Sequence, residues 1–378
     1  MIDLVRQEVI HMAHTIVVKI GTNVLTGEDG QIHRDRLQSL VDQVQRIREG
    51  GRKVVLVSSG AIGAGLGKIG METRPTDLRQ LQACASIGQP FLMRAYEECM
   101  EKHGVHTAQI LLTAGDFDNR IRYLNARNTL LTLFEWNVLP IINENDTISV
   151  DEIRFGDNDH LAALVTNLIQ APLLILLSVV DGLYSADPSV DPDAQRLDTV
   201  TSIDQNIHNM AGSSQSMLGT GGMRTKIKAA RLATTAGESV IMADGTKPGI
   251  LDSIMHAHTE GTLFLPQRDN MPAWKRWLGY TARTKGTIIV DNGAREAVER
   301  QGKSLLPIGV VKILGSFNKG DVVALRDREN NEFARGLCNY SSIDSEAISG
   351  KSSGEIGDIL GVVPYEELVH RDNLVVIS

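Results

Sequence analysis

A glycine-rich segment followed by a lysine is the strongest candidate for chemistry in this sequence. Three glycines lie within residues 219–222, and Lys226 follows them at the start of an apolar-periodic run over residues 225–235. Glycine lets backbone N–H groups approach a ligand closely, and the first turn of a helix presents unpaired N–H groups with partial positive charge. A lysine there adds charge that an anion would offset, so the segment predicts a phosphate site. An ordinary glycine turn before a helix is the alternative.

A second lysine lies at the C-terminal end of a predicted buried strand. Residues 15–20 are β-branched or apolar apart from Lys19, and a Gly-Thr-Asn turn follows. Ligands of open α/β sheets collect at the carboxyl ends of the strands. Lys19 and Lys226 could bracket a phosphoryl group, because its transfer needs positioning and positive charge more than covalent chemistry. Asp159 is the candidate carboxylate that would hold both ammonium groups in place.

Polar residues near other strand ends suit a small zwitterion. Ser59 follows a strand over residues 54–57, Asp146 follows a strand over residues 138–142, and Asn158 opens a helix. An aspartate can accept from an α-ammonium group, whereas amides and backbone N–H groups can donate to carboxylates. Asn158 could instead serve only as a helix N-cap.

Two familiar nucleotide motifs are excluded or weak. The Gly-Lys-Ser triplets at 302–304 and 350–352 lack the earlier glycine of a P-loop, because Ala297 and Ser345 stand at that position. A GxGxxG pattern at residues 65–70 begins well beyond the preceding strand rather than at its turn into a helix. The chain therefore predicts a phosphate site of a different type.

Composition is compatible with a globular enzyme of two or three domains. The chain has 378 residues, a net charge of −8 and three widely spaced cysteines. The charge gives no global indication of nucleic acid, and the odd, scattered cysteines favour a reducing, cytoplasmic location. The longest apolar run, residues 171–180, is far too short to span a bilayer, so we expect no membrane segment.

Alternating strand and helix patterns predict an α/β fold with a mainly parallel open sheet sandwiched by helices. We expect this catalytic domain over residues 10–265, a basic and aromatic linker over 266–285, and a small, mostly β domain over 286–378. Within the first, residues 58–67 are interpreted as a second small-residue loop. Residues 78–100 are interpreted as helical, with a break near the Gly-Gln-Pro sequence at 88–90.

Taken together, these motifs resemble the amino acid kinase family, in its branch that phosphorylates glutamate, and the tail resembles a PUA domain, a small β-barrel. The kinase motifs are VKIGT at 18–22, VSSGAI at 57–62, INEND at 142–146, FGDND at 155–159, GLY at 182–184 with Asp187-Pro188, and GTGGMRTK at 219–226. The tail motifs are GTIIVDNG at 286–293, SLLPIG at 304–309 and GSFNKGD at 315–321. The resemblance covers nearly the whole chain.

The resemblance implies ATP-dependent phosphorylation of the γ-carboxylate of L-glutamate, the first step of proline synthesis. Lys19 and Lys226 would stabilise the transferring phosphoryl group and Asp159 would orient them. The implied glutamate ligands are Ser59, Asp146 and Asn158. The implied ATP ligands are Lys19, Ser178, Val179, Thr220, Gly221, Gly222, Met223, Arg224, Thr225 and Lys226. The family usually has an acid at the position of Val179; here the acid comes at Asp181.

Cofactor and partners also follow from the resemblance. Mg²⁺ would be carried by the ATP phosphates, proline would be a feedback inhibitor, and the chain would form a homo-oligomer, a dimer or a tetramer. One alternative is a relative that acts on acetylglutamate, aspartate, carbamate or UMP. Another is an RNA-binding factor, since PUA domains often bind RNA. The net charge of −3 over residues 285–378 argues against it, and the basic segment 268–285 keeps it open.

Overall fold

The structure is a computed structural model, and the chain divides into two compact units, Met1–Asn270 and Met271–Ser378. Described here are residues 3–27, 31–71, 73–148, 158–188, 190–210, 222–267, 275, 277–361 and 365–377. None of the described helices combines the length and the apolar character that crossing a bilayer requires.

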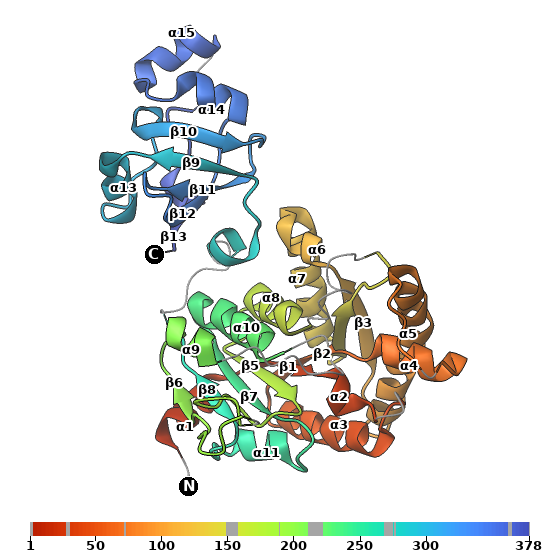
Figure 1. The fold of residues 1–378 in the computed structure, drawn as a ribbon. Helices are drawn as coiled ribbons and strands as arrows, with labels where there is room; N and C mark the ends of the chain where they lie inside the picture. The colour runs from red at the N-terminus through yellow and green to blue at the C-terminus, as the bar shows by residue number, and fades with distance from the viewer. Residues whose placement is uncertain are drawn as a thin grey trace. The chain divides into compact units, whose positions relative to one another are not determined.

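An eight-stranded sheet forms the first unit, with strand order β3-β4-β2-β1-β5-β7-β8-β6 (Figure 1). Its strands are β1 Thr15–Ile20, β2 Lys53–Ser58, β3 Thr107–Leu112, β4 Leu139–Glu144, β5 Leu173–Ser178, β6 Thr199–Val200, β7 Ser239–Asp244 and β8 Thr262–Phe264. Every pairing in it is parallel except that of β7 with β8. The expected mainly parallel α/β fold is confirmed.

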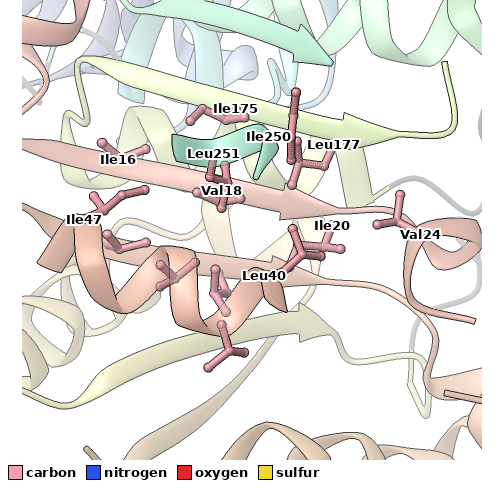
Figure 2. Close-up of a cluster of buried hydrophobic side chains, with 14 of the residues drawn as sticks. Ile16, Val18, Ile20, Val24, Leu40, Ile47, Ile175, Leu177, Ile250 and Leu251 are labelled. Carbon is pink, nitrogen blue, oxygen red and sulfur yellow. The ribbon is translucent and has the colours of Figure 1, made fainter. Parts of the chain in front are cut away.

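Helices lie on both faces of this sheet, with α3 and α11 on one face and α8 and α10 on the other (Figure 1). The helices of the unit are α1 Leu4–Met12, α2 Thr22–Leu25, α3 Arg34–Glu49, α4 Ala61–Ile69, α5 Leu78–Glu101, α6 Ala114–Asp118, α7 Arg120–Glu135, α8 Asn158–Ile169, α9 Gln205–Met210, α10 Met223–Ala236 and α11 Ile250–Met255. Figure 2 shows one core, in which Ile16, Val18 and Ile20 of β1 pack with Leu40 of α3 and with α11. The burial removes apolar surface from water and is the main force that holds the layers together.

The central strand β1 is buried on both faces, as its β-branched sequence predicts. Lys19 near its end pairs with Val57 of β2 on one side and with Leu176 of β5 on the other. Because these strands are parallel, their carboxyl ends meet at one edge of the sheet. That edge is where the residues of the candidate site gather.

Two sequence interpretations beside this edge are wrong. Residues from Ala61 onward form α4 rather than a loop, and α5 continues through Pro90 without a break. Close packing explains both, because a Cβ at Gly65 would lie 1.9 Å from the carbonyl oxygen of Cys84, and one at Gly88 would lie 1.8 Å from that of Ala61. Glycine lets the two helix backbones touch, and this contact supports helical structure where local propensity is poor.

At the far end of the sheet, helix α1 is fastened by Arg6. This side chain is 1% exposed, and its guanidinium donates to the carbonyl oxygens of Asp198, Glu260 and Gly261 at 2.6–2.9 Å. The acceptors lie next to β6 and β8, at the edge of the sheet. Arg6 therefore ties the N-terminal helix to residues beside strands that come 192 to 255 positions later in the chain.

A five-stranded sheet, ordered β10-β9-β11-β12-β13, forms the second unit around its own core. Its elements are η1 Trp277–Thr281, β9 Gly286–Val290, α13 Asn292–Glu299, η2 Pro307–Gly309, β10 Val310–Gly315, β11 Val322–Arg326, β12 Glu332–Leu337, α14 Ser342–Ile348, η3 Ser353–Glu355, α15 Ile356–Leu360, η4 Arg371–Asn373 and β13 Leu374–Val376. The expected mostly β tail is confirmed. The π-helix η1, which falls within the segment interpreted as a linker, contacts β12 and β13 and so belongs to this unit.

Candidate active site

Two lysines converge on one buried carboxylate at the strand ends. Lys19 Nζ lies 2.5 Å from Asp159 Oδ1, and Lys226 Nζ lies 3.1 Å from Asp159 Oδ2. The three residues come from β1, α8 and α10, and any two of them are more than sixty positions apart in the chain. The structure therefore brings Lys19, Asp159 and Lys226 together as the sequence analysis expected.

Burial makes this triad electrostatically strong. The Asp159 side chain is 1% exposed and the two lysine side chains are 8% exposed. Burial alone would raise the pKa of Asp159, but the charges of Lys19 and Lys226 outweigh it and hold the pKa well below its ordinary value. The triad has two cationic groups and one anionic group, so it has a surplus positive charge that suits a phosphoryl group.

The first turn of α10 extends the triad. Thr225 Oγ1 lies 2.8 Å from the carbonyl oxygen of Gly222 and 3.3 Å from Asp159 Oδ2, and its single O–H can donate to either of them. Gly222 is the N-cap of the helix and has no side chain to cap it, so among the described residues no N-cap side chain accepts from the N–H groups of this turn. Met223 is partly buried and Arg224 is exposed in the same turn. Thr220 and Gly221, also expected ATP ligands, lie outside the described residues.

An uncharged network forms the other half of the site. Asn158, the first residue of α8, has Nδ2 within hydrogen-bonding distance of Ser58 O at 2.8 Å, Ser59 Oγ at 2.9 Å and Asn143 Oδ1 at 2.9 Å, so its two N–H groups are shared among three acceptors. Two expected glutamate ligands, Ser59 and Asn158, are thus in direct contact. The third, Asp146, is partly buried in the turn that follows β4.

Two residues of α5 that were not among the predicted site residues support this network. Gln89 Oε1 accepts a hydrogen bond of 2.7 Å from Asn143 Nδ2. Tyr96 OH lies 2.9 Å from Ser58 Oγ, and burial raises the pKa of its phenol well above the ordinary value. The two positions are seven residues apart and so share one face of the helix. This spacing was the available signal, but the interpretation of a break at Pro90 hid it.

The end of β5 is the remaining expected ATP contact. Ser178 is buried, and its Oγ and the backbone of Val180 lie 3.3 Å apart, whereas Val179 is 50% exposed. Asp181 accepts from Tyr184 OH at 2.9 Å and lies 3.6 Å from Arg196. Since both carboxylate oxygens of Asp181 face partners in the chain, this acid does not simply replace the one missing at Val179.

A mainly parallel α/β sheet with a Lys-Asp-Lys triad at its strand ends and no P-loop defines a phosphotransferase class outside the P-loop enzymes. Comparison with known proteins agrees: residues 14–244 match the amino acid kinase family and residues 286–360 match the PUA domain. The chain belongs to the amino acid kinase family.

Curated relatives that match this chain over nearly their whole length have a name more specific than that of the family. The chain is 47% identical over 372 residues to a glutamate 5-kinase of Geobacter metallireducens, a match that covers 98% of this chain and 100% of the relative. It is 46% identical over 371 residues to one of Syntrophotalea carbinolica, covering 98% and 99%. It is 44% identical over 363 residues to one of Thermoanaerobacter sp. strain X514, covering 96% and 98%.

Proposed function

We propose that this chain transfers the γ-phosphoryl group of ATP to the side-chain carboxylate of L-glutamate. The observation that supports the transfer most strongly is the buried bridge of Asp159 between Lys19 and Lys226. The full-length similarity to glutamate 5-kinases supports the choice of acceptor. We further propose that the reaction is the first step of proline synthesis in the cytoplasm, with proline as its inhibitor and a homo-oligomer, a dimer or tetramer, as the working form.

The reaction needs charge stabilisation and no general base. An oxygen of the γ-carboxylate attacks the γ-phosphorus and forms a C–O–P linkage, while the bond to the bridging oxygen breaks and ADP leaves with the electron pair. The attacking carboxylate is already deprotonated at neutral pH, so no proton has to be removed. Asp159, whose pKa is lowered and whose oxygens face two ammonium groups, acts as the anchor of the lysines rather than as a base.

The residues present fit a nucleotide whose metal is held by its phosphates. Among the residues that the structure describes, no group of three or more His, Cys, Asp or Glu side chains could hold a metal ion. Mg²⁺ on the ATP phosphates would neutralise their charge, and Ser178, Val179 and residues 220–226 would hold the nucleotide beside Lys19. Both lysines would then stabilise charge on the transferring group.

The amides constrain how glutamate is held. Both N–H groups of Asn158 Nδ2 are occupied by acceptors of the chain, so the other polar atom of the side chain, Oδ1, is the one to offer a ligand. In this proposal Asn158 and Asp146 accept from the α-ammonium group, and Ser59 completes the pocket. Residue type alone suggests that an amide donates to a carboxylate, whereas the contacts of Asn158 Nδ2 support the role of an acceptor for Asn158.

ATP consumption with glutamate tests the proposal. We expect turnover that requires Mg²⁺ and is reduced by proline, and little turnover with N-acetylglutamate, aspartate, carbamate or UMP. The product should be an acyl phosphate, which hydroxylamine traps as a hydroxamate. Turnover with N-acetylglutamate in place of glutamate would refute the choice of substrate while leaving the phosphotransferase class intact.

A further inference from the structure

A chain of three amides runs from α5 into the proposed glutamate site. Gln89 accepts from Asn143 at 2.7 Å, and Asn143 accepts from Asn158 at 2.9 Å. Gln89 lies on α5, Asn143 in β4 and Asn158 at the start of α8. The three residues are 54 and 15 positions apart, so only the folded structure connects them.

Two backbone groups fix which amide donates and which accepts in each hydrogen bond among Gln89, Asn143 and Asn158. The N–H of Glu144 donates to Asn143 Oδ1 at 2.9 Å, so the Asn143 atom that faces Gln89 is its NH₂ group. Asn158 Nδ2 faces the carbonyl oxygen of Ser58 at 2.8 Å, so Asn158 must donate at that position. Since backbone groups cannot exchange their donor and acceptor roles, each amide has one allowed orientation.

Position 89 requires a hydrogen-bond acceptor, because it faces the NH₂ group of Asn143. It is 8% exposed, and its neighbour Gly88 brings α5 into contact with the start of α4, where a Cβ would lie 1.8 Å from Ala61 O. A residue without an acceptor at position 89 would leave the Asn143 NH₂ group unpaired in a buried place. An unpaired buried donor is costly, and the Asn143 amide can avoid that cost only by rotating away from Asn158.

We propose that Gln89 is a positioning residue for substrate recognition. Through Asn143 it supports the orientation of the Asn158 amide that Ser58 O sets, in which Oδ1, an acceptor, is presented to the α-ammonium group of the amino acid. The inference rests on the proposed function, because it names the group by which that site recognises its substrate. It predicts selection of a free α-amino acid over an N-acylated one, since an acylated nitrogen has lost its charge and two of its protons.

Gln89→Met tests this role, because methionine keeps the volume and removes the acceptor. We expect the KM for glutamate to rise about tenfold, the effect of roughly one hydrogen bond, while kcat and the KM for ATP change less than about twofold. The preference for glutamate over N-acetylglutamate should fall by a similar factor. Gln89→Asn, which keeps the amide but withdraws it by one methylene, should act in the same direction if the methionine variant does not fold.

A double-mutant cycle separates positioning from general support. If Gln89 acts through Asn158, then in an Asn158→Ala background Gln89→Met should change the KM for glutamate less than about twofold. Additive effects of the two substitutions would overturn the proposal, and so would an unchanged KM in the single variant.

Gln43→Met is the matched control. Gln43 is also buried, and its Oε1 accepts from the N–H of Leu251 at 2.8 Å, in the layer formed by α3 and α11. Its replacement should lower the unfolding temperature without changing the KM for glutamate. Equal changes of KM in both methionine variants would mean that Gln89 is only structural.

The unmodified chain is assayed first. If it shows no turnover with glutamate, the proposed function itself fails. Turnover by the unmodified chain together with an unchanged KM in the Gln89→Met variant refutes the positioning role alone.

Discussion

The two halves of the site use opposite means at the same edge of the sheet. On the proposed phosphoryl side, Lys19, Asp159 and Lys226 hold one another by ion pairs. On the proposed glutamate side, Asn143 and Asn158 are neutral and hold one another by hydrogen bonds of fixed direction. Charge suits a group whose charge distribution changes in the transition state, whereas directed amides suit a ligand that only has to be recognised.

This contrast predicts which kinetic constant each half of the site should control. The ionic half should control kcat, because its interactions strengthen as charge develops on the transferring group. The amide half should control the KM for glutamate, because in the proposal it contacts a part of the substrate that does not react. The variants below test whether the two halves separate in this way, starting from the largest expected effect.

Lys226→Ala should have the largest effect. We expect kcat to fall by about 10²–10³, typical of losing one preorganised charge, with the KM for glutamate within about threefold of its original value. Steady-state kinetics with glutamate and ATP measure both. Lys228, exposed on the same helix, provides the control, and Lys228→Ala should leave kcat unchanged. A large rise in KM with intact kcat would contradict the assignment of Lys226 to the ionic half.

Gly88→Ala should perturb the amide half through packing. The added Cβ would lie 1.8 Å from Ala61 O, so α5 or α4 must move. We expect a loss of about 1–3 kcal/mol in the free energy of unfolding, together with a higher KM for glutamate. Chemical denaturation and kinetics measure the two effects. At Gly115 in α6 the nearest atom would be 3.7 Å away, so Gly115→Ala is the tolerated counterpart.

Asp146→Ala should raise the KM for glutamate about tenfold and leave the KM for ATP unchanged. The reason is that an acceptor for the α-ammonium group is lost, an effect of roughly one charge-assisted hydrogen bond at a partly exposed position. The KM for ATP serves as the internal reference. An unchanged KM for glutamate would remove Asp146 from the site.

A change of pH within the neutral range should have the smallest effect on kcat. The pKa of Asp159 is lowered in the folded chain, so the stability that its charge contributes is present above the ordinary carboxyl range and lost only as the pH falls through the folded value. We therefore expect no step in kcat from Asp159 between about pH 6 and 8, well above carboxyl pKa values. A step in this interval that Asp159→Asn abolishes would show that the carboxylate titrates during turnover.

Most of the fold was predictable because its strands are encoded locally. β1 and β5 are apolar apart from Thr15, Lys19 and Ser178, a pattern typical of a sheet covered on both faces, and the carboxyl ends of such strands mark the site. The pairing of Lys19 and Lys226 through Asp159 followed from the same rule together with the charge that a phosphoryl group requires.

The support of the site was not predictable because it depends on packing between helices. Pro90 and the glycines of α4 normally break helices, so local propensity favoured a break and a loop. Their helical state arises only when Gly65 and Gly88 let α4 and α5 touch. Gln89 reaches Asn143 as a result of that contact, and a single sequence gives no indication of which strand end it will meet.

The edge of the sheet beside which Arg6 anchors α1 also matters for association between molecules. The outermost strand of the large sheet on this side, β6, spans only Thr199–Val200, and Arg6 engages carbonyl oxygens beside it. Open sheet edges can pair with those of other molecules, and short strands or covering elements limit such association. The shortness of β6 thus leaves little of this edge open to such pairing, and Arg6 holds α1 against the carbonyl oxygens of Asp198, Glu260 and Gly261 beside it.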